Sequence, residues 1–398
     1  MTVEGLQHGK QINPVQQSLV THHGAQCGYC TPGIVVALCA LFDQIPCPSR
    51  QEATRALVGN LCRCTGYDSI LEAVAHVDHT QWRETSDLYP DHELIHDLER
   101  FAAESVEIVA DGRILLKPAT FDEAVCLRNS RPDATVLAGG TDLGVQWNKR
   151  GREFSTLLHI GGLSELTDYS VRDRTWILGA GTTITQLEQQ AKSILPAYAR
   201  MLERFGSPPI KNVATLGGNL ANGSPIGDSM PALLVLEAEV ELISVAGSRR
   251  VNLNQFYTGY RRNVLAANEL VRRVIVPLPA DNQLFATYKI SKRRDLDIST
   301  FTAAVWMDVV GDVIRAARIA FGGVAPTIVR LPRTEAWLSE RRFTETTLRQ
   351  AGALAKEEIA PISDVRGSAQ YRSLLAENIL VKFGREVLEA PVPSRNGN

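Results

Sequence analysis

Four of the seven cysteines in this chain of 398 residues form two close pairs. Cys27 and Cys30 are separated by two residues in QCGYCTPG, and Cys62 and Cys64 by one residue in NLCRCTGY. Each pair stands just ahead of a segment with the pattern of a helix, where free backbone N–H groups and the helix dipole favour a thiolate. Four thiolates around an oxidised two-iron, two-sulfide core carry a net charge of about −2, which two helix N-termini would stabilise.

The spacing leaves alternatives open. Structural zinc sites with four cysteines usually show two C-x2–4-C turns, and the single residue between Cys62 and Cys64 fits that pattern less well. Unrelated core cysteines would not be expected to gather in two pairs that are each followed by threonine. The spacing alone therefore favours an iron–sulfur cluster over zinc or no metal. We expect Cys39, Cys47 and Cys126 to be core or loop thiols.

Helices must position these thiols, and the sequence predicts four of them within residues 1–80. We expect their N-caps to be Asn13, Thr31, Ser49 and Asp68. The segment that follows, 78–107, holds nine acidic residues against two Lys or Arg, which is typical of a linker, with a short helix near HELIHDLERFA.

The composition is that of an ordinary globular chain, with 44% hydrophobic and 22% charged residues and a formal net charge of −2. This charge gives no reason to expect a nucleic acid or an anionic membrane as a partner. No apolar run is long enough to span a bilayer, and the first residues lack the features of a secretory signal. We therefore expect a cytoplasmic protein, in which closely spaced cysteines more often bind metals than form disulfides.

Two glycine-rich segments follow predicted strands in an α/β region over residues 111–281, namely LAGGTDLG (137–144) and ATLGGNLANGSPIGD (214–228). Neither is a strict G-x-G-x-x-G fingerprint, so a nicotinamide-binding Rossmann domain is not expected. Bare N–H groups of consecutive glycines can hold a pyrophosphate, and two such loops suggest a dinucleotide held from both sides. Each loop alone is equally compatible with a plain tight turn. The remaining strands and helices predict a separate α+β domain.

The motifs QCGYCTPG and GNLCRCTGY resemble the helical [2Fe-2S] domain of the molybdenum hydroxylases, a family that includes xanthine dehydrogenase, aldehyde oxidase and carbon monoxide dehydrogenase. The resemblance implies one cluster in this chain, bound by Cys27, Cys30, Cys62 and Cys64. Ahead of this domain the family carries a plant-type ferredoxin domain with a C-x4-C-x2-C set, which these residues do not contain. We expect that domain either to precede Met1 in a longer chain or to come from a separate polypeptide.

The glycine-rich loops resemble the FAD-binding domain of the same family, which is of the vanillyl-alcohol-oxidase or PCMH type. The implied fold is a multidomain α and α+β chain. It has a four-helix [2Fe-2S] domain at 1–80, an acidic linker at 81–110, an FAD-binding domain at 111–281 and a CO-dehydrogenase-flavoprotein-like α+β domain at 285–390. The implied FAD contacts come from both loops and from three further positions: Gly139, Gly140, Thr141, Asp142, Gly144, Phe205, Ala214, Thr215, Gly217, Gly218, Asn219, Asp228 and Lys289.

Three of these positions have specific roles by resemblance. Asp228 matches an acid at the ribose and adenine end of FAD, Phe205 an aromatic ring beside the isoalloxazine, and Lys289 a lysine that contacts FAD. Without the resemblance, Phe205 would be read as a core residue and KRRDLD (292–297) as a solvated turn. In the family this turn lies near the flavin, where NAD binds, and has two acids after its arginines. Leu296 takes the place of one of them here.

The resemblance covers essentially the whole chain and implies an electron-transfer oxidoreductase subunit of the xanthine dehydrogenase type. Xanthine or hypoxanthine would be oxidised at a molybdenum cofactor on a molybdopterin-binding partner, in a hetero-oligomer such as a dimer of heterodimers. Electrons would pass through the [2Fe-2S] cluster to FAD and on to NAD+. No catalytic side chain is expected here because the cofactors carry the chemistry. The alternatives are an aldehyde oxidase, another aromatic hydroxylase or reductase, or a zinc-stabilised scaffold without activity.

Overall fold

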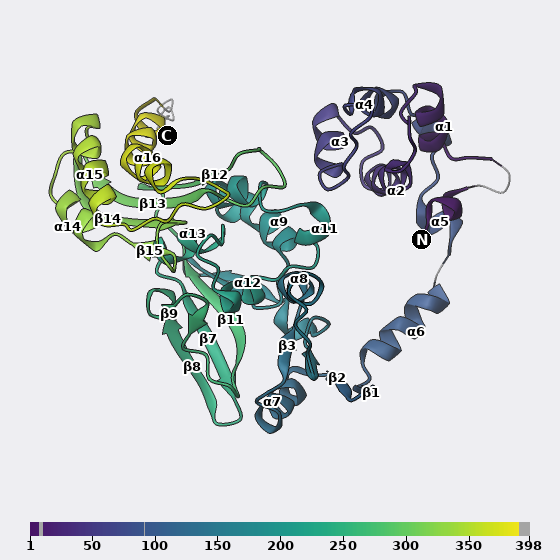
Figure 1. Ribbon diagram of the computed structural model, residues 1–398, viewed down its shortest axis with the longest axis horizontal. Helices are drawn as coiled ribbons and strands as arrows, with labels where there is room; N and C mark the ends of the chain where they lie inside the picture. The colour runs from purple at the N-terminus through teal and green to yellow at the C-terminus, as the bar shows by residue number, and fades with distance from the viewer. Residues whose placement is uncertain (8–10, 91, 390–398) are drawn as a thin grey trace, which may run out of the picture. The chain divides into compact units, whose positions relative to one another are not determined.

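Figure 1 shows the computed structural model, which describes residues 1–7, 11–90 and 92–389. The chain divides into two compact units. The first unit is Met1–Phe101 with Ser207–Pro209, and the second is Ala102–Gly206 with Ile210–Asn398. Across the described residues, no helix has both the length and the apolar character needed to cross a membrane.

The first unit is helical and has its own core. The four predicted helices are confirmed as α1 (Pro14–Thr21), α2 (Thr31–Phe42), α3 (Arg50–Ala56) and α4 (Asp68–Ala75). Its other elements are η1 (Val3–Leu6), η2 (His79–Gln81), α5 (Thr85–Leu88) and α6 (His92–Ala102), the last being the short helix predicted near HELIHDLERFA. Ile34 and Leu38 of α2 and Ile70 of α4 are almost fully buried in the same apolar cluster, which forms the core of this unit.

Two of the four predicted N-caps are wrong by one residue. Asn13 and Ser49 cap α1 and α3, each in a capping box with the side chain three residues on. Helices α2 and α4 already begin at Thr31 and Asp68, and neither has a side-chain cap. Their cap positions are occupied by Cys30 and by Tyr67, the latter in the left-handed region at φ 71°. At these two helix starts, the cap position is therefore occupied by a cysteine or by a residue close to one, and not by a residue whose side chain caps the helix.

The second unit begins with a four-stranded sheet in the order β1-β2-β4-β3. Its strands are β1 (Val106–Ala110), β2 (Arg113–Lys117), β4 (Thr156–His159) and β3 (Thr135–Leu137), with α7 (Phe121–Ser130) and α8 (Thr141–Arg150) between them. Strand β1, at the end of the acidic segment, pairs antiparallel with β2, whereas β3 and β4 are parallel. The first glycine-rich loop joins β3 to α8, as a βαβ crossover requires.

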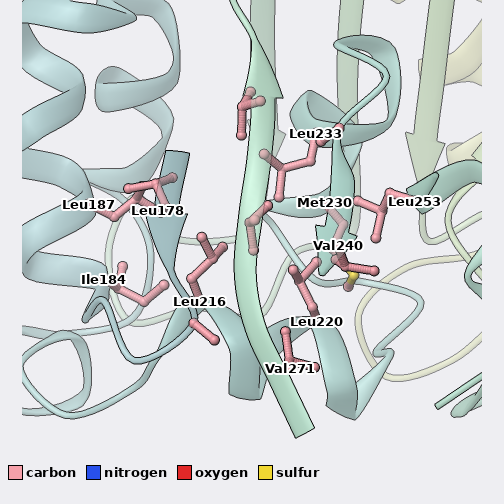
Figure 2. Close-up of a cluster of buried hydrophobic side chains, with 14 of the residues drawn as sticks. Leu178, Ile184, Leu187, Leu216, Leu220, Met230, Leu233, Val240, Leu253 and Val271 are labelled. Carbon is pink, nitrogen blue, oxygen red and sulfur yellow. The ribbon is translucent and has the colours of Figure 1, made fainter. Parts of the chain in front are cut away.

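A five-stranded antiparallel sheet follows, in the order β5-β6-β11-β7-β8. Its strands are β5 (Tyr169–Arg172), β6 (Thr175–Gly179), β11 (Leu270–Pro277), β7 (Glu239–Ser244) and β8 (Gly247–Asn252). The accompanying elements are η3 (Ser164–Leu166), α9 (Ile184–Ile194), α10 (Pro196–Leu202), α11 (Pro208–Lys211), α12 (Leu216–Asn222), α13 (Met230–Val235), η4 (Leu253–Gln255) and the hairpin β9 (Tyr257–Gly259) and β10 (Arg262–Asn263). Leu216 and Leu220 of α12 lie in the same buried cluster as Leu178 of β6 and Val271 of β11 (Figure 2). This packing fixes α12, and with it the second glycine-rich loop.

The last sheet has the order β12-β13-β14-β15 and its own core. It consists of β12 (Gln283–Ile290), β13 (Phe301–Val310), β14 (Val313–Gly322) and β15 (Val329–Arg330), with α14 (Pro332–Leu338), α15 (Glu345–Glu357) and α16 (Ala369–Glu389). The mixed α+β content predicted for this part of the chain is confirmed. Phe301, Ile319 and Phe383 are fully buried or nearly so, which joins the sheet to α16.

Candidate iron–sulfur and flavin sites

The structure brings the four predicted thiols together in the first unit. Cys27 lies in the turn after α1 and Cys30 directly before α2, while Cys62 and Cys64 lie in the turn that leads to α4. The thiol of Cys27 interacts with that of Cys64, and the thiol of Cys30 with that of Cys62. Each spatial pair therefore takes one thiol from each loop. Cys27 and Cys64 are exposed, and the other two are half-buried.

The surroundings of these thiols favour ionisation of one member of each pair. A hydrogen bond from the Tyr29 backbone N–H, followed by the Cys64 thiol, lowers the pKa of Cys27. The Thr65 hydroxyl, 3.1 Å from Cys62 Sγ, and the Thr65 backbone N–H lower the pKa of Cys62 to about 7. Burial and Cys62 raise the pKa of Cys30, and Cys27 raises that of Cys64. The site therefore stabilises thiolate charge on Cys27 and Cys62, and an iron–sulfur cluster is bound by thiolates.

Thr65 and Tyr67 belong to this site and were missed by the sequence reasoning. The Tyr67 hydroxyl accepts from the Cys62 N–H at 2.9 Å and donates to the Asn60 carbonyl at 2.9 Å. Its backbone N–H donates to Thr65 Oγ1 at 3.1 Å. Together they fix the Cys62–Cys64 turn. In the sequence, the only indication of their role was the threonine that directly follows the second cysteine of each pair, Thr31 after Cys30 and Thr65 after Cys64.

Glycines leave room beside the thiols. Gly28 and Gly66 adopt φ values of 79° and 64°, where a side chain would be strained. Nothing lies within 4 Å of a Cβ placed on either, so the space next to both turns is open. Two thiol pairs, open space and a bias towards thiolate fit a two-iron centre with two thiolates on each iron. Within the described residues, no three His, Cys, Asp or Glu side chains are grouped to hold one metal ion.

In the second unit, the two glycine-rich loops lie against each other. A Cβ on Gly139 would lie 1.7 Å from the Val213 carbonyl oxygen, so only glycine permits the contact between the first loop and the start of the second. Gly140 precedes α8 at φ 69° without a side-chain cap, and Thr141, Asp142 and Gly144 lie within the first four residues of that helix. The first turn of α8 therefore presents backbone N–H groups beside the second loop.

The second loop is built into α12. Thr215 caps that helix by accepting from the Gly218 N–H at 3.1 Å, and the Gly217 N–H donates to the Ala180 carbonyl at 2.7 Å. Ala214 is buried and precedes this cap. Asn219, in the first turn of α12, accepts a hydrogen bond from Ser229 at 2.6 Å. The second loop is therefore tied to GAGTT (179–183), the segment at the end of β6.

Asp228 and Lys289, two predicted FAD contacts, form a buried ion pair. Lys289 Nζ lies 2.6 Å from Asp228 Oδ2, with side-chain exposures of 2% and 9%. Ser299, which is 1% exposed, donates to the other carboxylate oxygen. Ser299 was not singled out from the sequence, because its partner lies 71 residues away. The trio joins the turn before α13 to β12 and the segment after it.

Three family models match the chain. They are the [2Fe-2S] binding domain over residues 2–75, the FAD binding domain in molybdopterin dehydrogenase over 107–279, and the CO dehydrogenase flavoprotein C-terminal domain over 286–387. The chain belongs to the iron–sulfur and flavin part of the molybdenum hydroxylase family. This confirms the resemblance inferred from the cysteine and glycine motifs and the multidomain fold class.

Curated relatives align over almost the entire chain. The xanthine dehydrogenase of Drosophila pseudoobscura pseudoobscura is 29% identical over 99% of this chain and 34% of that protein. The xanthine dehydrogenase of Emericella nidulans is 26% identical (98% and 33%), and a nicotinate hydroxylase of the same organism is 27% identical (96% and 36%). The chain thus spans about a third of the length of the curated relatives it matches.

Solved structures share the fold of the flavin part. Carbon monoxide dehydrogenase from Hydrogenophaga pseudoflava has a TM-score of 0.65 at 28% identity, covering 69% of this chain and 96% of that chain. Quinoline 2-oxidoreductase from Pseudomonas putida 86 has a TM-score of 0.62 at 28% identity, covering 68% and 94%.

The residues of this molybdenum hydroxylase chain fit an FAD. Two buried polar atoms beside the glycine-rich loops, Arg261 Nε and Thr182 Oγ1, have no hydrogen-bond partner in the part of the chain that the structure describes. Thr182 is fully buried, and its carbonyl accepts from the Leu216 N–H of the second loop. Unsatisfied polar atoms beside a helix start without a side-chain cap are what a bound dinucleotide would complete.

Phe205 and the 292–297 turn lie close to one another. Phe205 follows α10, is half-buried and packs on the edge of the main core, so the core and ligand interpretations both remain compatible with its position. Arg204 donates to the Lys289 carbonyl at 3.0 Å and reaches Ser291 and Arg294 at longer range. Leu296 adopts a φ of 59°, and the turn is closed by a hydrogen bond from the Arg293 N–H to Asp297 at 2.7 Å.

A cavity of about 800 Å³ lies beside these residues, and none of its lining residues belongs to the glycine-rich loops. It is lined by α10, β12 and α16, and includes Arg204 and Lys289. Of the predicted FAD contacts, it therefore involves only Lys289.

Proposed function

We propose that this chain carries electrons from a molybdenum cofactor on a molybdopterin-binding partner to NAD+, through one [2Fe-2S] cluster and FAD. The observation that supports this most directly is the thiol arrangement: four cysteines from two loops meet in one unit, in a chain whose other unit matches an FAD-binding domain. Cys27, Cys30, Cys62 and Cys64 would hold the irons. The glycine-rich loops, Asp228, Lys289 and Phe205 would hold the flavin.

The flavin, when bound, supplies hydride transfer to NAD+, and the cluster supplies one-electron transfer. The chain's own residues bind, orient and electrostatically support these groups. Thr65 and the backbone of the cysteine turns would stabilise thiolate charge, and the buried Lys289–Asp228 pair would fix the flavin side. No side chain of this chain is proposed as a nucleophile or general base.

We propose xanthine or hypoxanthine as the substrate oxidised on the partner, which would place the protein in purine catabolism in the cytoplasm. Xanthine dehydrogenases among the relatives support this assignment. The partner would form a hetero-oligomer with this chain, such as a dimer of heterodimers. The second cluster of the electron path would come from a ferredoxin-type domain elsewhere. A second candidate substrate class is an N-heteroaromatic compound, favoured by the similarity to a nicotinate hydroxylase and a quinoline 2-oxidoreductase.

The absorption spectrum of the purified chain separates this proposal from a zinc-stabilised scaffold. We expect flavin bands near ~450 nm on top of broad iron–sulfur absorbance, with about two irons per chain, because four thiolates hold a two-iron core. Metal analysis of the same sample gives the comparison. A colourless protein that contains stoichiometric zinc would refute the redox role.

The isolated chain should reduce an artificial dye with NADH as donor but should not oxidise xanthine. The reason is that the flavin accepts hydride directly, whereas purine oxidation needs the molybdenum centre of the partner. Both rates are measured with and without the co-expressed partner chain. Xanthine turnover by this chain alone would contradict the subunit assignment, and N-heteroaromatic turnover without xanthine turnover in the complex would favour the second substrate class.

A further inference from the structure

Arg261 has a strained backbone at the tip of the β9–β10 hairpin. The hairpin pairs Gly259 with Arg262, and Arg261 adopts a φ of 52° in the turn between them. Turn positions with positive φ are normally occupied by glycine or asparagine, because a side chain there costs about 1 kcal/mol or more. A conformation of this kind persists only when the surroundings hold it in place.

The hairpin is attached to the helix of the second glycine-rich loop. The Tyr257 hydroxyl donates to the Leu220 carbonyl at 3.0 Å, and Asn263 Nδ2 donates to the Ala221 carbonyl at 2.9 Å. A Cβ on Gly223, the residue that ends α12, would lie 3.6 Å from the Arg261 Cα. The backbone of Arg261 is therefore held from both sides against α12.

The side chain of Arg261 reaches the helix of the first glycine-rich loop. Its two terminal nitrogens lie 3.4 Å from the two carboxylate oxygens of Asp142, in the first turn of α8. These distances are long for a charge-assisted pair, whose N–O separation is typically about 2.7–2.9 Å. Arg261 Nε is buried and has no hydrogen-bond partner among the described residues. The guanidinium is therefore loosely paired and incompletely satisfied. It reaches the first turn of α8 from a backbone that is held at the C-terminal end of α12, within the second glycine-rich segment (214–228).

We propose that Arg261 binds the pyrophosphate of FAD. The inference rests on the proposed binding of FAD by the two loops and assigns the cation that this group requires. A pyrophosphate at the uncapped start of α8 would meet backbone N–H groups but also the Asp142 carboxylate. Arg261 offsets that carboxylate and supplies donors in a planar fork that suits phosphate oxygens. Its strained turn is kept because it points the guanidinium at the ligand.

Substitution by glycine tests this directly, since glycine removes both the side chain and the strain. We expect Arg261→Gly to lower the affinity of the flavin-free full chain for FAD about tenfold or more, while its unfolding midpoint stays equal or rises. FAD affinity is measured by quenching of flavin fluorescence, and riboflavin, which lacks the pyrophosphate, is titrated in parallel. Riboflavin affinity should not change. An equal loss for both flavins, or no loss for FAD, would overturn the proposal.

Arg262→Met is the matched control. Arg262 is exposed, lies next in the chain and makes no ion pair within the described residues, so FAD binding should stay as in the parent.

Asp142→Asn provides the second test. If Arg261 contacts the pyrophosphate, Arg261→Gly still weakens FAD binding in the Asp142→Asn background. If its effect vanishes there, Arg261 acts only through Asp142 and the proposal is wrong. A parent chain that binds no FAD would instead refute the proposed function.

Discussion

A chain carrying Cys62→Ser is expected to lose its iron–sulfur cluster. The pKa of the Cys62 thiol is lowered to about 7 by the hydroxyl and the backbone N–H of Thr65, so this thiol ionises readily near neutral pH. A serine hydroxyl at this place stays protonated at neutral pH and is a poor ligand for iron compared with a thiolate. Iron and sulfide content per chain, and the paramagnetic signal after reduction, should both fall to near zero.

The same experiment has an internal comparison. Cys64→Ser should behave like Cys62→Ser, since the two residues belong to different thiol pairs and each pair would serve one iron. Cys47→Ser is the control, because that thiol is exposed and lies outside both pairs. Flavin content should be retained in all three variants, since the FAD residues belong to the other unit. A full cluster signal in Cys62→Ser would show that the ligand assignment is wrong.

The parts of the cysteine site that are local in sequence could be predicted from it. The C-x2-C and C-x-C pairs ahead of helices can be recognised in the amino-acid sequence, and so can the N-caps Asn13 and Ser49 with their partners three residues on. The hydrogen bonds of Tyr67 with Cys62 and Asn60 could not be predicted. They depend on the left-handed backbone of Tyr67, which no pattern of residue types specifies.

The flavin site shows a sharper limit. The glycine-rich loops are recognisable because consecutive glycines after a strand allow a tight turn and leave backbone N–H groups accessible to a phosphate. The contacts that join these loops to distant residues have no local signal: Asp142 meets Arg261 at a separation of 119 residues, and Asp228 meets Lys289 at 61. The strand β1 was likewise hidden, because it lies at the end of an acidic segment and is stabilised by pairing with β2 rather than by its own composition.

Asp228→Ala is expected to weaken FAD retention and to destabilise the second unit. Removing the carboxylate leaves the Lys289 ammonium, 2% exposed, without its partner in an interior site. Breaking a buried ion pair by removing one member typically costs about 3–5 kcal/mol, because the remaining charge is neither solvated nor paired. Flavin content after gel filtration and the free energy of unfolding in denaturant measure the two effects.

A second variant separates stability from binding. Asp228→Ala combined with Lys289→Met removes both charges, so much of the lost stability should return, since an apolar replacement of a buried pair is often neutral. Flavin retention should not return, because the group proposed to bind the ribose end is still missing. Asp281→Ala, at an exposed acid of the same unit without an ion pair among the described residues, is the control and should change neither quantity. Unchanged flavin content in Asp228→Ala would count against a role for this carboxylate in holding FAD, and would leave the buried pair as a purely structural link between α13 and β12.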